Sequence, residues 1–197
     1  LRQEILQKIE NLKQDIPENV FVLQKAEYVQ YPSKEDINFL VTEYISIRNI
    51  SLNKQEKTAY LKFLEGLQST LVVTTKVMIV DVEYTQKAKE TYTVVIKSLQ
   101  LNNRTNAQFV ETIPKSVASS ASEIHSSHQF SVLKNDPILK FEMPENDLLS
   151  YYFTGTKELS SMQGIKSVLI IEPSMQQLKT TRLTGFSIFP FPKIFYF

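Results

Sequence analysis

Alternating apolar and polar residues dominate the middle of the chain and predict an antiparallel β protein. Leu71–Tyr84 and Thr91–Leu101 are rich in the β-branched and aromatic residues that favour strands. The linker between them is short and charged, so we expect these two strands to pair antiparallel. Turn signals built on Pro, Gly, Asn and Asp separate the further predicted strands, which are His128–Leu133, Ile138–Met143, Leu148–Thr154 and Ile165–Glu172.

The short intervals between these strands favour a β-sandwich over a parallel α/β sheet. The expected fold is therefore mainly β, with one or more antiparallel β-sandwiches, an N-terminal helix and one short helical connection. We expect three parts. Residues 1–17 form the helix, residues 18–69 a small α+β or β subdomain, and residues 70–197 a β-sandwich domain that ends in an aromatic strand or stem.

The first sixteen residues predict an amphipathic helix. Ile5, Ile9, Leu12 and Ile16 recur at spacings of four, three and four residues, which places them on one stripe among charged and polar residues. Pro17 then ends the helix. We interpret it as a helix that packs on its own domain, and the alternative is the end of a coiled coil.

The next segment is harder to assign. Val20–Gln30 and Ile37–Arg48 are rich in β-branched and aromatic residues and flank a turn-forming stretch, which predicts a hairpin. The second of them also matches a helical face with Ser33 as N-cap, and we adopt the strand interpretation. Asn53–Gln68 has the composition of a short helix or a long connection.

Composition excludes several classes of function. The 22 Lys and Arg balance 21 Asp and Glu, and no basic stripe is present, so we expect no nucleic-acid partner. The absence of cysteine removes disulfides, thiolate catalysis and cysteine-ligated zinc. No glycine-rich phosphate-binding loop occurs, and we expect no cofactor.

Candidates for metal or acid–base chemistry lie near the two histidines. His125 and His128 are three residues apart and close to Glu123, a spacing that on a helix would bring two imidazoles to one face. The flanking serines favour an exposed loop instead, and no third ligand is evident, so we assign no metal site. The alternative function is a hydrolase-like or metal-dependent enzyme that uses His125, His128 and neighbouring carboxylates.

Two sequons mark possible glycosylation sites. Asn49 and Asn103 each begin an Asn-X-Ser/Thr triplet in a polar, turn-like context. They agree with a surface location without establishing it.

One stretch resembles a known module. It comprises Phe109–Ile124 (FVETIPKSVASSASEI), Asp136–Phe141 (DPILKF) and a strand that ends in Tyr152–Gly155 (YFTG). This series is similar to a small β-sandwich of membrane-anchored archaeal cell-surface proteins, in which IPKSVA…SAxEI leads into DPxLxF. The resemblance implies a β-sandwich and a location in the cell envelope, and it brings no catalytic residues.

The chain ends in a dense aromatic segment. Pro190 and Pro192 exclude a central position in a sheet, which favours an edge strand, a stem or a docked arm. We expect it to run toward a membrane anchor that lies beyond this sequence, or to form a partner surface. The residues concerned are Phe186, Phe189, Phe191, Phe195, Tyr196 and Phe197.

These observations together predict a non-enzymatic extracellular domain of a membrane-anchored surface protein. Its role would be structural or protein-binding, and its partner another protein or a second copy of itself.

Overall fold

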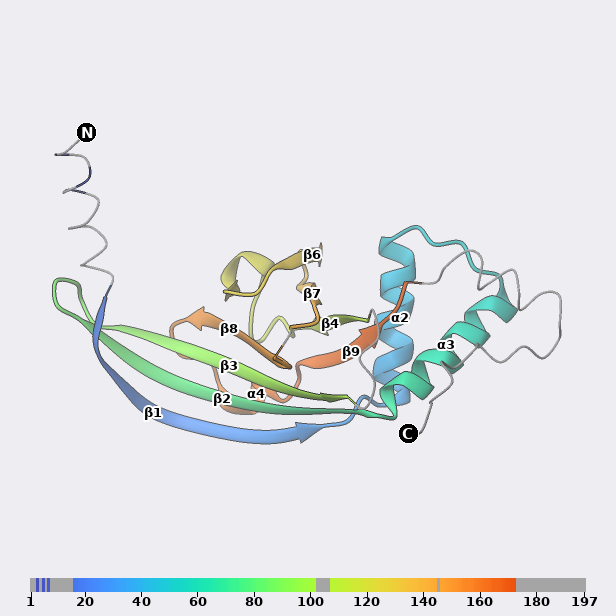
Figure 1. The fold of residues 1–197 in the computed structure, drawn as a ribbon, viewed down its shortest axis with the longest axis horizontal. Coiled ribbons are helices and arrows are strands. Elements are labelled where there is room, and N and C mark those ends of the chain that lie inside the picture. The colour runs from blue at the N-terminus through green and yellow to red at the C-terminus, as the bar shows by residue number, and fades with distance from the viewer. Residues whose placement is uncertain are drawn as a thin grey trace, which may run out of the picture.

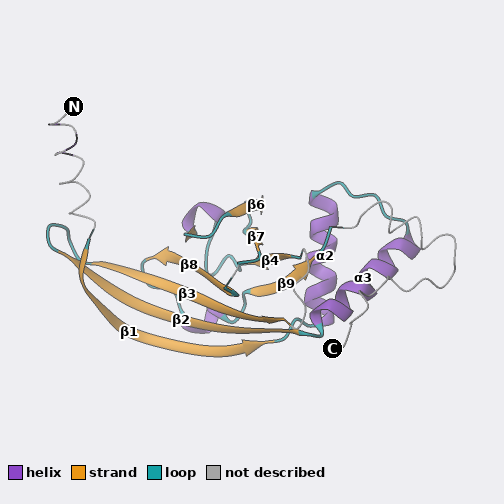
Figure 2. Cartoon of the chain, viewed as in Figure 1, coloured by secondary structure: helices purple, strands orange, loops and turns teal. Residues whose placement is uncertain are grey.

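The computed structural model describes residues 3, 5, 7, 16–101, 107–144 and 146–172. These residues form two antiparallel sheets and three α-helices (Figures 1 and 2), which confirms the predicted mainly β class. The five-stranded sheet has the order β1-β2-β3-β8-β5, and the four-stranded sheet has the order β6-β7-β4-β9. The strands are β1 (Pro17–Gln30), β2 (Leu71–Tyr84), β3 (Glu90–Leu101), β4 (Gln108–Thr112), β5 (His125–Ser126), β6 (Phe130–Lys134), β7 (Ile138–Glu142), β8 (Leu148–Thr154) and β9 (Lys166–Ile170).

Three long strands, β1, β2 and β3, form a curved ribbon (Figure 1). The predicted antiparallel pairing of β2 with β3 is confirmed, with Val77 opposite Val95. β8 pairs with Tyr92–Ser98 of β3, and the hairpin end of the ribbon extends beyond β8 (Figure 1).

A hydrophobic core joins the inner faces of the two sheets. Side chains alternate between the two faces of a strand, so one set of residues from each sheet points inward. The five-stranded sheet contributes Val77, Val95 and Tyr151, and the four-stranded sheet contributes Phe109 and Phe141 to the same buried cluster.

A second core lies on the other face of the four-stranded sheet, beneath helices α2 (Lys34–Ile47) and α3 (Lys54–Gln68). Leu40, Tyr44 and Leu64 of the helices pack with Val110 of β4 and Val168 of β9. Residues on both sides of position 69 thus share the same sheets and cores, because β1 pairs with β2 and the helices cover β4 and β9.

The hairpin prediction for Ile37–Arg48 was wrong, because this segment is helix α2. Ser33 is its N-cap and forms a reciprocal capping box with Asp36, which satisfies two backbone N–H groups at the start of the helix. The spacing of the buried Ile37, Leu40 and Tyr44 fits a helical face. Capping and periodicity therefore outweigh the β-branched composition. The alternative of a helix capped by Ser33 was correct.

Asn53–Gln68 is helical, as one of the two predicted alternatives stated. Asn53 caps α3 and forms a second capping box with Glu56. The side chain of Gln68 then accepts a hydrogen bond from the backbone N–H of Leu169 and donates one to its carbonyl, which ties the end of α3 to β9.

The serine-rich segment after β4 lies against the sheets. Val117, Ala118, Ala121 and Ile124 are buried in the first core, around a 3-10 helix at Ala121–Glu123. β5 then pairs with β8 at the edge of the five-stranded sheet. Most of the predicted N-terminal helix lies outside the described residues. Gln3, Ile5 and Gln7 are helical and exposed.

Two adjacent residues of α2 test the second core. Leu40 is fully buried and Phe39 is 53% exposed. Leu40→Ala should lower the free energy of unfolding by about 2–5 kcal/mol, because it leaves a cavity between helix and sheet. Phe39→Ala should change it by less than about 0.5 kcal/mol. Urea unfolding measures both, and equal losses would contradict this packing.

Candidate functional site

The most unusual surface of the molecule is strand β1. Every residue from Pro17 to Lys25 is exposed, although the sequence is apolar. Val20, Phe21, Val22 and Leu23 expose between 47% and 58% of their surface. A strand with such a sequence would ordinarily be buried, so this exposure needs an explanation.

Among the described residues, β1 also has a free edge. It is the first strand of its sheet, and in this part of the chain it pairs only with β2. Figure 1 shows it along the lower border of the sheet, with no described element beyond it. The outward-directed backbone N–H and C=O groups of an edge strand can pair with another strand. A bulge at Leu23 is one protective feature, but the exposed half of β1 carries only two charges, Glu18 and Lys25.

The apolar surface continues from β1 across the outer face of the sheet, which we define as the face turned away from the first core. Val22 lies opposite Val80, and Val80 lies opposite Tyr92. In the next row, Met78 lies opposite Val94, and Val94 lies opposite Tyr152. The outer face therefore carries apolar side chains on four strands, and Lys25 and Lys76 lie among them. Val80 and Val82 are buried, whereas the others are exposed or half-buried: Val20, Val22, Met78, Tyr92, Val94, Ile96 and Tyr152.

Aromatic side chains border this face on β3, β8 and β5. The rings of Tyr92 and Tyr152 meet edge to face, with centroids 5.4 Å apart. His125 stacks on Tyr152 at 5.0 Å. Tyr84 completes the row, with its hydroxyl 3.2 Å from that of Tyr92. Such contacts hold the aromatic side chains in fixed positions.

The hairpin between β2 and β3 is fastened by Asp81. Its carboxylate accepts hydrogen bonds from Lys89 at 2.6 Å and from the Thr91 hydroxyl at 2.6 Å. These two donors, Lys89 first, hold the pKa of Asp81 below its usual value. The projecting end of the ribbon is thus cross-linked by side chains even though it lies outside the two cores.

A buried ion pair connects the two sheets. Lys97 of β3 and Glu111 of β4 form a salt bridge, and both side chains are fully buried. The Lys97 ammonium also donates to Ser167 Oγ at 2.8 Å, and the Ser167 hydroxyl donates to Glu111 at 2.7 Å. Burial, followed by the charge of Glu111, raises the pKa of the nearby Tyr28 to about 12. A buried charge needs such a partner, because burying it alone is costly.

This group of a lysine, a glutamate and a serine is not arranged for nucleophilic catalysis. Nucleophilic use of Ser167 would need a free base to take its proton. Lys97 instead donates a hydrogen bond to Ser167 Oγ, and the Ser167 hydroxyl donates one to Glu111, whose carboxylate is already paired with Lys97. Ser167 does border a cavity of about 350 Å³ between the end of β1, the start of α2 and the start of β9. The ion pair itself serves to join the sheets.

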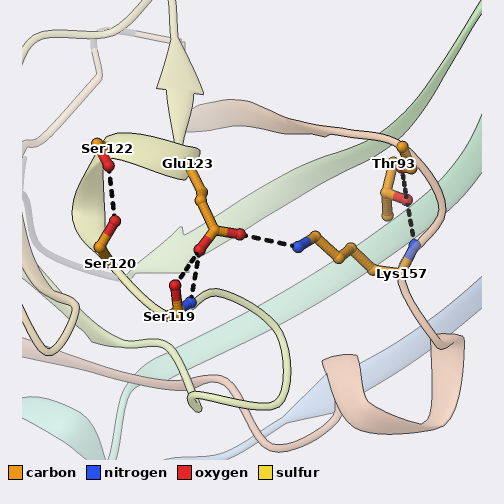
Figure 3. Close-up of polar contacts among 7 residues, drawn as sticks. Thr93, Ser119, Ser120, Ser122, Glu123 and Lys157 are labelled. Atoms are coloured by element: carbon orange, nitrogen blue, oxygen red, sulfur yellow. Dashed lines mark hydrogen bonds and ion pairs between the residues drawn. The ribbon is translucent and has the colours of Figure 1, made fainter.

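The three candidate residues around the histidines, to which no metal site was assigned, make separate contacts in the structure. Glu123 accepts hydrogen bonds from the backbone and side chain of Ser119 and forms an ion pair with Lys157 at 3.0 Å (Figure 3). His125 stacks on Tyr152, whereas Nδ1 of His128 lies 3.4 Å from the Ser150 carbonyl oxygen. Within the described residues, no three His, Cys, Asp or Glu side chains are grouped so that they could hold a metal ion.

The remaining predicted positions are partly described. Asn49 is exposed in the turn after α2, where its φ of 52° suits an asparagine. Asn103 lies outside the described residues. So do Phe186, Phe189, Phe191, Phe195, Tyr196 and Phe197 of the aromatic C-terminal segment.

Sequence reasoning missed both the ion pair and the exposure of β1. The sequence did contain a signal for the ion pair, because Lys97 occupies an inward-facing position of its strand, between the buried Val95 and Leu99. Glu111 likewise alternates with Phe109 on the inward side. The sequence contained no signal for the exposure of β1, because an apolar run such as that of β1 is the same in a central strand and in an edge strand.

No protein-family model, curated protein or solved structure matches this chain. In the described part of the chain, no helix is both long and apolar enough to span a bilayer.

Removing one member of the ion pair should be far more costly than removing both. Lys97→Met should lower the free energy of unfolding by about 3–5 kcal/mol, because it leaves Glu111 buried without its ion-pair partner. Lys97→Met combined with Glu111→Leu should restore most of that loss. The exposed pair of Lys76 with Glu27 provides the control, and Lys76→Met should cost less than about 1 kcal/mol. Similar losses for Lys97→Met and Lys76→Met in urea unfolding would contradict this role.

Glu123 should make stability sensitive to acid. Ser119 first, and then Lys157, lower its pKa from 4.5 to about 2. The ionised carboxylate therefore stabilises the fold fully above about pH 4.5, and this contribution disappears as the pH falls toward 2. The difference in unfolding free energy between wild type and Glu123→Gln should shrink from about pH 6 to about pH 3.

The control for this pH dependence is Glu142→Gln, at an exposed glutamate of β7. Urea unfolding at both pH values measures the two variants. A difference for Glu123→Gln that does not change with pH would rule out the lowered pKa.

Proposed function

We propose that this chain is a non-enzymatic protein-binding module, whose partner adds an extended polypeptide segment beside β1. The observation that carries the proposal is the fourteen-residue edge strand whose apolar half is exposed. When a strand is added to a sheet edge, backbone hydrogen bonds provide the affinity and alternate side chains provide the specificity.

The side chains on the two faces of β1 indicate which kind of segment it would bind. Val20 and Val22 lie on the outer face, whereas Phe21 lies on the opposite face. A partner strand would meet apolar side chains on both of its faces and only sparse charge. The favoured partner is therefore an extended segment with small apolar residues on both faces.

The contacts that hold the ribbon in place before a partner binds support this proposal. The ribbon that carries β1 is held by the Lys97–Glu111 pair and, near the β2–β3 hairpin, by Asp81, Lys89 and Thr91. A partner would therefore bind a strand that is already extended, and little conformational entropy would be lost on this side of the interface.

We place the module in the extracellular part of a membrane-anchored surface protein, as a β-sandwich. The similarity of Phe109–Ile124 and Asp136–Phe141 to archaeal cell-surface modules supports this location. The aromatic residues near the C-terminus, such as Phe195 and Phe197, suit a membrane interface. The partner would then be another protein of the cell surface.

Selection from a phage library of random peptides tests the docking function. Peptides that bind the folded chain should be extended and apolar, and the double substitution Phe21→Lys with Val22→Lys should weaken their binding at least tenfold, because lysine blocks edge pairing. Phe39→Lys, at a similarly exposed apolar residue of α2, should leave binding unchanged. Circular dichroism checks that each variant is folded. Peptides that bind the edge variant as tightly as the wild type would overturn the proposal.

A further inference from the structure

We propose that the segment accepted by β1 is β1 of a second copy, paired antiparallel about a two-fold axis near Phe21. This inference rests on the proposed function, because it names the partner of the same edge. The self-complementarity of the exposed half of β1 leads to it.

The first argument is the order of the apolar residues. An antiparallel pair centred on Phe21 places Val20 of each copy opposite Val22 of the other. Each pair then lies on the outer face, where the two valines already face Val82 and Val80 of β2. A two-fold axis thus covers four exposed apolar side chains with side chains of the same kind.

The second argument is charge. Glu18 and Lys25 are the two charged residues of the exposed half, and they lie near its opposite ends. Antiparallel pairing brings Glu18 of one copy toward Lys25 of the other, and symmetry does so twice. Parallel pairing in register would instead set glutamate beside glutamate and lysine beside lysine, which is unfavourable. The charges therefore select the antiparallel arrangement.

The third argument is the surface that results. The pairing joins two five-stranded sheets into one and makes their apolar outer faces continuous. The overlap is long enough for this role, since the nine residues of β1 from Pro17 to Lys25 that pair about Phe21 span about 30 Å. The paired edges no longer expose backbone groups, which removes the hazard that an unprotected edge presents.

The absence of cysteine from the chain makes a direct test possible. A residue on the two-fold axis lies opposite its own copy, within the separation of about 4–7 Å that a disulfide can bridge. Under mild oxidation, Phe21→Cys should form a covalent dimer, whereas Phe39→Cys on α2 should remain mainly monomeric. Light scattering should give the wild type twice the mass of one chain, and the Phe21→Lys, Val22→Lys variant the mass of one.

Charge reversal tests the direction of pairing. Glu18→Lys places a lysine opposite Gln24 of the second copy and next to its Lys25, and should raise the dissociation constant of the dimer about tenfold. Adding Lys25→Glu to the Glu18→Lys variant restores opposite charges and should return the dissociation constant of the dimer to near its wild-type value. Failure of the second substitution to rescue the first would overturn the antiparallel register.

The outcomes separate the two proposals. A wild type that stays monomeric at high concentration, with no preferred cross-link at Phe21→Cys, shows that the second copy is not the partner. If selected peptides still bind β1 in that case, the docking function stands without self-association. If neither dimer nor peptide binding depends on Phe21 and Val22, both proposals are wrong.

Discussion

The buried ion pair between Lys97 and Glu111 is the constraint on which the relation of the two sheets depends. One charge belongs to the central region of the five-stranded sheet and the other to the middle of the four-stranded sheet, and neither is exposed. Hydrophobic packing tolerates small displacements, whereas a buried charge cannot move away from its partner without a large cost. Ser167, on β9, adds a third strand to the same contact. The pair therefore fixes which residues of the two sheets face one another.

The ion pair constrains only the inner face of the ribbon, and only the part of the ribbon around Lys97. Past the pair, Val77 and Val95 still belong to the first core, whereas Ile79, Val80 and Val82, nearer the hairpin, are buried but belong to neither of the two cores among the described residues. The sheet thus presents a fixed inner face, an apolar outer face and an open edge. A protein that binds partners by strand addition needs this combination, because the edge must be extended before the partner arrives.

Local patterns were enough to predict β2, β3 and β8, where alternation is regular and turn residues mark the ends. They failed at α2, because Ile37–Arg48 has the composition of a strand and only the Ser33–Asp36 capping box and the helical spacing reveal its conformation. Whether β1 would be buried could not be predicted, since an apolar strand becomes an edge only through the arrangement of distant segments. The partner of Lys97 also depends on tertiary structure, although its inward position was readable from the alternation of β3.

Hydrogen exchange of the β1 amides, measured at low and high protein concentration, tests the central claim most directly. In a single copy, the N–H groups on the open edge of β1 exchange with solvent, and pairing with a second copy protects them. We expect peptides from Pro17–Gln30 to exchange more slowly as the concentration rises, while peptides from Lys54–Gln68 are unaffected. Exchange in β1 that is fast and the same at every concentration would contradict the claim that this edge is the interface.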